Sequence, residues 1–305
     1  MSKAITTQAT NKLNLVGKLL NVQFGSGTLS DGRPYKRANV VIRTTQTYNN
    51  QNETSEVPIS IFATEHTSTG KANPAWASLK ELETMKSVQD FGLEKADRIR
   101  LTGASLQENY FISRTGQLID GWQIRGSFVN RAQDTMMDAA SFIVEIFIMS
   151  MDEEINRDGD VTGRLKIKGG VVQYGGKLDV VEFFVENPDT IDYITRNWAI
   201  NKTVTVKGRI RVTSEEVAPS GESSGWGEDV PEGPTTQFVR ELIITTGDDE
   251  PKEDEFAYDE NDIKKAFIER KAAIEQKQID ARKKASTNTS AANAPETTAH
   301  KYDWE

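Results

Sequence analysis

The sequence predicts a mostly β protein built from two small barrels in tandem, followed by a charged helix and an acidic, flexible tail. Short runs of Val, Ile, Thr and aromatic residues, separated by Gly, Asn and Asp, fill most of residues 1–246. The same order of elements occurs twice in that stretch, and after Gly247 the composition becomes charged and polar. The predicted units are 1–133, 134–247 and 248–305.

Each of the two copies opens with a strand in which glycine precedes a basic residue and leucine. This strand is Leu15–Leu19 in the first copy and Val161–Leu165 in the second. A long extended stretch follows, Tyr35–Thr45 resuming at Glu56–Phe62 in the first copy and Lys177–Glu186 in the second. The period equals the length of a domain, so the repeat indicates two similar units rather than a solenoid.

A helix and two further strands complete each copy. Asn73-Pro74 and Asn187-Pro188 are helix-start signals, because Asn caps the first turn and Pro lacks only an N–H that would be unpaired there. The strands that follow are Arg98–Gly103 and Trp122–Gly126 in the first copy, and Thr203–Gly208 and Phe238–Ile244 in the second. This is the element order of the five-stranded OB barrel, so the prediction is two tandem OB-like barrels.

Two segments lie outside this repeat. Residues 136–151 are apolar without clear alternation, which fits a buried strand or a helix between the barrels; their β-branched residues favour the strand. After an acidic linker at 248–255, a charged helix is expected over Ile263–Lys284, capped by Asn261 or Asp262. Its thin apolar stripe, Ile263, Phe267, Ile274 and Ile279, suits docking on the barrels or on a partner.

Composition argues against most enzyme classes. There is no cysteine, and the two histidines, His66 and His300, leave little material for catalytic triads or metal sites. No phosphate-binding loop or dinucleotide fingerprint occurs, and Gly25-Ser26-Gly27 is interpreted as a turn. We therefore expect no enzyme activity, cofactor or metal; the weaker alternative is a metal-dependent nuclease using the acidic runs Asp152–Glu154 and Asp158–Asp160.

The chain lacks the features of an exported or membrane protein. Its N-terminus has no apolar signal segment, and no uncharged apolar run is long enough to span a bilayer. A cytoplasmic protein without membrane contact is expected. The net charge of −9 is unevenly distributed: residues 1–133 hold 16 Lys and Arg against 11 Asp and Glu, and both later units are acidic. This uneven distribution of charge indicates that the first unit binds a polyanion. The alternative is that the chain is acidic only for solubility.

One strand of the first copy combines cations with an aromatic ring. Proteins that bind single-stranded nucleic acid without sequence preference need Lys and Arg for phosphates and flat rings for bases. With an alternation of two, Ala38, Val40 and Ile42 point to the core. The opposite face then carries Arg33, Tyr35, Arg37, Asn39, Val41 and Arg43. The alternative is an outer face whose charges are merely solvated.

Other residues extend this candidate surface. Tyr110 and Phe111 lie in a predicted polar insertion and would either stack with bases or plug a barrel end, whereas Phe62 and Trp122 are expected in the core. The second copy is a weaker candidate because Glu182 and Glu186 lie beside its cations. The remaining candidates are Lys18, Lys36, Arg98, Arg100 and Arg125 in the first copy, and Arg164, Lys166 and Lys168 in the second.

The last residues, Tyr302, Asp303, Trp304 and Glu305, form an acidic and aromatic tip after a polar, low-complexity stretch. Such a tip suits docking into basic, apolar pockets of partner proteins, and it could also compete with nucleic acid for the basic strand. An unselected end of the chain is the alternative.

The strand order, the Tyr35/Arg37/Arg43 strand and the acidic, aromatic tail together resemble bacteriophage single-stranded DNA-binding proteins. The resemblance implies a protein of the infected cell that coats single-stranded DNA during replication and recombination. It also implies tail-mediated recruitment of replication or recombination proteins. Bacterial relatives end in Phe, whereas here Glu305 follows Trp304. The runner-up is a phage structural or assembly protein without DNA affinity; the oligomeric state stays open.

Overall fold

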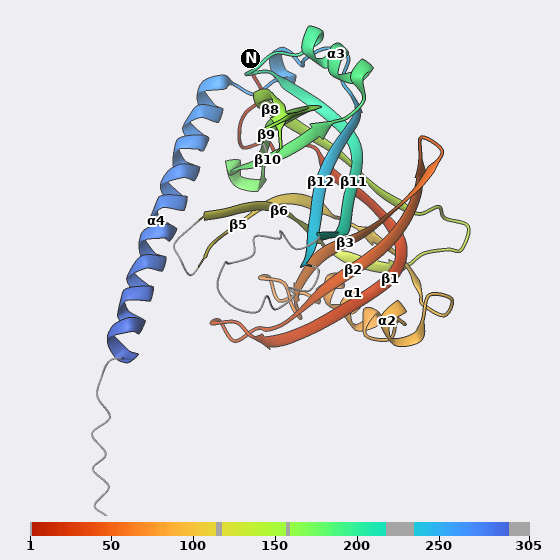
Figure 1. Cartoon of the computed structure of the whole chain (residues 1–305). Helices are drawn as coiled ribbons and strands as arrows, with labels where there is room; N and C mark the ends of the chain where they lie inside the picture. Colours follow the sequence, from red (N-terminus) through yellow and green to blue (C-terminus); the bar gives the residue numbers. More distant parts are fainter. Residues whose placement is uncertain (1, 114–117, 157–158, 218–234, 293–305) are drawn as a thin grey trace, which may run out of the picture.

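The computed structural model describes residues 2–113, 118–156, 159–217 and 235–292. The prediction of a mostly β chain whose strands are followed by a long helix is confirmed (Figure 1). The described strands are β1 (Asn11–Thr28), β2 (Pro34–Tyr48), β3 (Gln51–Thr64), β4 (Arg98–Thr102), β5 (Ser105–Ile112), β6 (Leu118–Gly126), β7 (Phe128–Arg131), β8 (Ala139–Ile155), β9 (Val161–Val172), β10 (Leu178–Val185), β11 (Thr203–Val217) and β12 (Thr235–Gly247). The described helices are α1 (Pro74–Leu82), α2 (Val88–Phe91), α3 (Pro188–Asn197) and α4 (Glu260–Ala292).

The strands after residue 138 close into a five-stranded barrel. β8 pairs with β9, β9 with β10, β10 in parallel with β12, β12 with β11, and β11 returns to β8. Along the chain, α3 comes between β10 and β11, the third and fourth strands of this barrel, as predicted. The first strand is β8, however, so the prediction that Val161–Leu165 opens the second copy was wrong; this segment begins the second strand, β9.

The strands before residue 132 pair in a similar order, and β5 and β6 form an additional antiparallel hairpin. β1, β2 and β3 are antiparallel neighbours, β3 pairs in parallel with β6, and β4 pairs with both β1 and β7. β4 and β5 are nearly continuous, with Gly103 at a φ of 67° at their bend. The segment with Tyr110 and Phe111, predicted as a polar insertion, is therefore strand β5 paired with β6.

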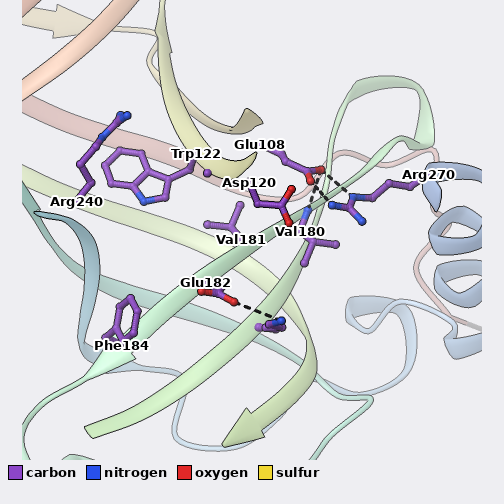
Figure 2. A pocket seen from close by; sticks show the side chains of 11 residues that line it. Glu108, Asp120, Trp122, Val180, Val181, Glu182, Phe184, Arg240 and Arg270 are labelled. Atoms are coloured by element: carbon purple, nitrogen blue, oxygen red, sulfur yellow. Dashed lines mark hydrogen bonds and ion pairs between the residues drawn. The ribbon is translucent and has the colours of Figure 1, made fainter. Parts of the chain in front are cut away.

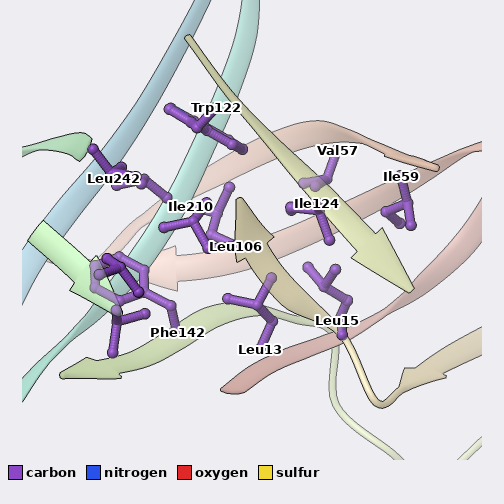
Figure 3. Packing of buried hydrophobic residues seen from close by; sticks show 14 of the residues in the cluster. Leu13, Leu15, Val57, Ile59, Leu106, Trp122, Ile124, Phe142, Ile210 and Leu242 are labelled. Carbon is purple, nitrogen blue, oxygen red and sulfur yellow. The ribbon is translucent and has the colours of Figure 1, made fainter. Parts of the chain in front are cut away.

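The two halves share one sheet and one core. The start of β1 pairs with the start of β8, from Asn11 opposite Val144 to Val16 opposite Ala139. Buried side chains from both halves, among them Leu13 and Phe142, belong to the same apolar cluster (Figure 3). Residues 139–155 are a strand, as favoured. Val144 to Ile148 are all buried, since this strand is covered on both faces, and this explains its poor alternation.

Local signals place the helices. Asn73 caps α1 by accepting from the Ala75 N–H, and Asn187 caps α3 by accepting from the Thr190 N–H. At α4 the capping carboxylate is Asp259, which accepts from the N–H groups of Asn261 and Asp262; the prediction of a cap at either of those two residues was wrong.

The long helix α4 runs along one side of the molecule (Figure 1). Ile263 and Ile274 of the predicted stripe are buried and Phe267 is partly buried, whereas Ile279 is exposed. No helix in the described part of the chain is long and apolar enough to cross a membrane.

The segment before α4 is fixed against the C-terminal barrel. The buried carboxylate of Glu145 pairs with Lys3 and, at 2.9 Å, with Lys252. The hydroxyl of Tyr258 donates to the Thr7 carbonyl at 2.8 Å, and burial raises its pKa. These contacts hold the first residues of the described chain and the segment before α4 on the same barrel.

Candidate nucleic-acid interface

Several of the residues predicted to bind nucleic acid lie close together on the outer face of β1, β2 and β3. On β2 the predicted alternation is confirmed: Ala38, Val40 and Ile42 are fully buried, and Arg37 and Asn39 are exposed. Cross-strand register places Gly27 of β1 opposite Tyr35, and Arg37 opposite Phe62 of β3. The side chains of Tyr35, Arg37 and Phe62 therefore occupy neighbouring positions on one surface.

Tyr35 and Phe62 form a stacked aromatic pair on this face. Their ring centroids are 5.3 Å apart with an interplanar angle of 30°, and Phe62 remains 50% exposed. The prediction that Phe62 lies in the core was wrong. Ile61 and Ala63 take the inward positions on either side, so the alternation along β3 turns Phe62 outward. That alternation was visible in the sequence. The prediction that Trp122 lies in the core is confirmed, because Trp122 is buried.

Two glycines make room for this cluster. Gly25 and Gly27 lie within β1, so the interpretation of Gly25-Ser26-Gly27 as a turn was wrong. A Cβ atom at Gly27 would lie 2.7 Å from the Tyr35 hydroxyl oxygen, and one at Gly25 would lie 2.6 Å from Nε of Arg37. The side chains of Tyr35 and Arg37 therefore lie across the bare backbone of β1.

Three candidate arginines accompany the aromatic pair. Arg43 lies further along β2, opposite Lys18 of β1, and Arg125 of β6 is in register with Ser60 of β3. Within the described residues Arg37, Arg43 and Arg125 have no carboxylate partner. They remain available to an external anion.

Four other candidates from the first half are engaged elsewhere. Their ammonium or guanidinium groups already contact oxygen atoms of this chain, at 2.5–2.8 Å, which lowers their value as phosphate ligands. The pairs are Lys18 with the Ala96 carbonyl, Arg33 with Asp31, Lys36 with Glu83, and Arg98 with Asp138.

Three further candidates of the first half lie away from the aromatic pair. Arg100 is exposed on β4. On β5, the Nζ atom of Lys277 from α4 lies 4.4 Å from the ring centroid of Tyr110, so the helix covers this ring. The next residue, Phe111, is 55% exposed.

Two of the three candidate cations of the C-terminal barrel are paired with carboxylates. Arg164 pairs with Glu154, Glu186 and Glu241, while Lys168 pairs with Glu182 at 3.3 Å. Lys166, in contrast, has no ion-pair partner in the described chain. Arg164 and Lys168 are therefore less available to an external anion than Arg37, Arg43 and Arg125.

Arg211 and Arg209 extend the carboxylate network around Arg164. Arg211 pairs with Glu186 and Glu241, and Arg209 reaches across to Glu53 of β3. Burial alone would raise the pKa of Glu241, but hydrogen bonds from Arg164 and Arg211 outweigh it and hold the pKa below its usual value. The network joins the two halves through the pair of Arg209 with Glu53.

Two of the hollows between the halves of the described chain share a lining residue. One, of about 410 Å³, lies beside Trp122, Phe184 and Arg270, and its charges are largely paired, Glu108 with Arg270 and Lys168 with Glu182 (Figure 2). The other, of about 610 Å³, borders the β1–β3 face at Val41 and Pro58. Arg240 of β12 lines both hollows.

Arg240 was missed from the sequence because nothing in its strand marked it. Its guanidinium carbon lies 4.7 Å from the Trp122 ring centroid, and no carboxylate of the described chain pairs with it. The predicted partner-binding tip, formed by Tyr302, Asp303, Trp304 and Glu305, lies outside the described residues.

Comparison with known proteins gives one family and two solved structures. No curated protein matches the sequence. The fold is similar to wild-type single-stranded DNA binding protein from Thermus aquaticus, with a TM-score of 0.48 and 10% identity, over 81% of this chain and 96% of that chain. A deletion variant of the same Thermus aquaticus protein gives a TM-score of 0.49 and 13% identity, over 81% of this chain and 97% of the other. The match to the YorF family extends over residues 9–280, and the chain therefore belongs to the YorF family.

Proposed function

We propose that the protein binds single-stranded DNA on the outer face of β1, β2 and β3. The observation that carries the proposal is the Tyr35–Phe62 pair, which exposes a ring beside an arginine that has no carboxylate partner among the described residues. Aromatic rings offer a stacking surface to any unpaired base, and the neighbouring cations suit the phosphates that follow. The β2–β3 face is also where OB barrels commonly bind oligonucleotides.

Binding of this kind involves no covalent chemistry. Arg37, Arg43 and Arg125 would neutralise phosphates and release counterions, so affinity falls as salt rises. Bases stack on Phe62 and Tyr35 with little dependence on their identity, because every base has a π-face. A duplex keeps its bases stacked inside and offers none to these rings. Preference for single strands over duplex follows from this geometry.

The wider role we propose is the coating of single strands during replication or recombination of phage DNA. The first unit, 1–133, is the principal DNA-binding domain in this proposal. The second, 134–247, supports it, and 248–305 ends in the acidic tip that recruits partner proteins. The uneven charge of the chain supports this division, since only the first unit carries excess positive charge.

The test is a titration of the full-length protein against a fluorescent dT oligonucleotide at low and high salt, with a duplex of equal length as competitor. We expect tight binding at low salt, weaker binding at high salt and poor competition by the duplex. Absence of binding at low salt, or equal competition by the duplex, would contradict the proposal and favour an assembly protein without DNA affinity.

A further inference from the structure

The outer face of β1–β3 continues from the aromatic pair into the larger of the two hollows. The rows of paired residues lead from Gly25, Arg37 and Phe62 to Asn21, Val41 and Pro58 without leaving the three strands. The last three residues line the hollow of about 610 Å³. A strand that lies on the aromatic pair and follows β2 is therefore led to the hollow.

The walls of the hollow come from three parts of the chain. The sheet face supplies Val41 and Pro58, α2 supplies Val88, and the C-terminal barrel supplies Val212 and Arg240. The lining is mainly apolar, and the side-chain amides of Asn21 and Gln89 and the carboxylate of Glu56 add hydrogen-bonding groups. An apolar slot with a few polar groups and one cation suits a flat, partly polar base attached to a phosphate.

Arg240 supplies the charge that selects the occupant. Among the described residues it has no carboxylate partner, and its guanidinium carbon lies 4.7 Å from the centroid of the Trp122 ring. Most other arginines of the C-terminal barrel are neutralised by Glu154, Glu186 and Glu241, so Arg240 differs from them. Arg240, positioned by its contact with the Trp122 ring, is therefore available to pair with a phosphate at the hollow.

We infer that this hollow is a nucleotide subsite, in which one base of the bound single strand enters between α2 and β12 while Arg240 contacts its phosphate. The inference rests on the proposed function and extends it, because it makes the C-terminal barrel contribute directly to the site. It also predicts that a bound strand follows β2 from the aromatic pair to the junction between the halves.

The absence of cysteine from the sequence makes a direct test possible. Val41→Cys and Val88→Cys each introduce a single thiol at the hollow, one on the sheet and one on α2, where both side chains are partly exposed. Ile200→Cys, which is 50% exposed in native form and does not line the hollow, is the control. The rate of modification by a neutral maleimide is measured with and without dT oligonucleotide. We expect the oligonucleotide to slow modification at positions 41 and 88 but not at 200.

A second measurement follows the charge. Arg240→Ala should weaken dT binding severalfold and reduce the slope of log affinity against log salt by about 0.7, the value for one phosphate contact on a single strand. Arg240→Lys should keep most of that slope. Arg196→Ala removes an exposed arginine of α3 that pairs with Asp192, and it should leave both quantities unchanged.

The outcomes separate this inference from the proposed function. Protection of both thiols together with the loss on Arg240→Ala supports the subsite. Binding of dT with no protection at position 88 and an unchanged Arg240→Ala variant overturns the subsite and leaves the sheet face as the site. No binding of dT by the native protein overturns both.

Discussion

Tyr35 and Phe62 owe their exposure to neighbouring residues more than to their own chemistry. Ile61 and Ala63 take the inward positions beside Phe62, and Gly27 leaves the backbone of β1 bare beneath the Tyr35 ring. Exposed aromatic rings have an unfavourable hydration that a stacked base would relieve. The pair is therefore suited to contact with an external partner.

The first prediction concerns Phe62. Phe62→Ala removes a half-exposed ring, so we expect dT binding to weaken by about 1–3 kcal/mol, the range for loss of one stacked base. The melting temperature should change little because few core contacts are lost. Fluorescence anisotropy measures the affinity. Phe256→Ala removes another exposed ring, 64% exposed, and should bind like the native protein; equal affinity of both variants would remove Phe62 from the site.

The second prediction concerns Gly27. In Gly27→Ala the new methyl group would lie 2.7 Å from the Tyr35 hydroxyl, so the ring must move from its place beside Phe62. We expect weaker dT binding in a protein that still folds. Gly121→Ala makes the same change on β6, where the nearest atom lies 3.6 Å away, and should bind normally. An unchanged affinity for Gly27→Ala would show that the ring position does not matter.

At the scale of elements, α4 is attached to the barrels by a few contacts along its first half. Its apolar stripe is narrow, with Ile263 and Ile274 buried, and Arg270 donates from Nε at 2.8 Å to Glu108 of β5. The Glu108 carboxylate is 4% exposed, so Arg270 compensates a charge that water hardly reaches. The hydrogen bond from Arg270 is the main polar attachment of the helix to the first half.

The third prediction follows from this attachment. Arg270→Ala leaves the Glu108 carboxylate buried without its cation, which costs about 3–5 kcal/mol for a buried pair. We expect hydrogen exchange in α4 to accelerate, since undocking the helix exposes Glu108 to water. Lys264→Ala breaks an exposed pair with Glu260 and should have only a small effect. Glu108→Gln in the Arg270→Ala background should restore much of the protection; slow exchange in Arg270→Ala would contradict the account.

Elements set by local signals could be predicted from the sequence. The helices α1 and α3 begin at Asn-Pro because cap and proline chemistry act within one turn. The position of each strand in the barrel was harder to predict. The apolar strand β8 is covered on both faces, so its sequence carries no alternation, and the second copy was therefore counted from β9. The pairing of β8 with β1, which is distant in the sequence, is likewise invisible to a local pattern.

At the scale of the whole molecule, the two halves are joined by a sheet, a core and a network of ion pairs. β1 pairs with β8, and Arg209 of the C-terminal barrel reaches Glu53 of β3. Glu241 lies at the centre of the network with Arg164 and Arg211. Its carboxylate is 13% exposed, and the hydrogen bonds from the two arginines lower its pKa, so ionisation of Glu241 favours the folded state.

The fourth prediction concerns the pH dependence of stability. The folded-state pKa of Glu241 lies below the usual 4.5, so its ionised form favours folding. This contribution is complete above about pH 4.5 and is lost as the pH falls through the folded-state value. Glu241→Gln should lower the urea midpoint at about pH 7 and reduce its further loss at about pH 4. A variant that loses stability on acidification as steeply as the native protein would contradict this role.

The candidate site was only partly predictable from the sequence, because the partners of its charged residues come from distant strands. Alternation placed Tyr35, Arg37 and Arg43 on one face, and it could have placed Phe62 beside them. It could not show that Arg98 holds Asp138 or that Arg164 is surrounded by glutamates, because those partners come from other strands. Arg240 depends in the same way on the approach of β12 to Trp122. The sequence gives the number of charged residues, but only the fold shows which of them are paired with a residue of opposite charge.

The central claim is tested most directly by the affinity of the full-length protein for a dT oligonucleotide at low salt. The comparison is between the native protein, Tyr35→Ala/Phe62→Ala, and Tyr174→Ala/Phe256→Ala, which removes two exposed rings elsewhere. The account predicts tight binding by the native protein and the control, and a loss of about 2 kcal/mol or more in the Tyr35/Phe62 variant. Equal binding by all three proteins, or no binding by any of them, would contradict it.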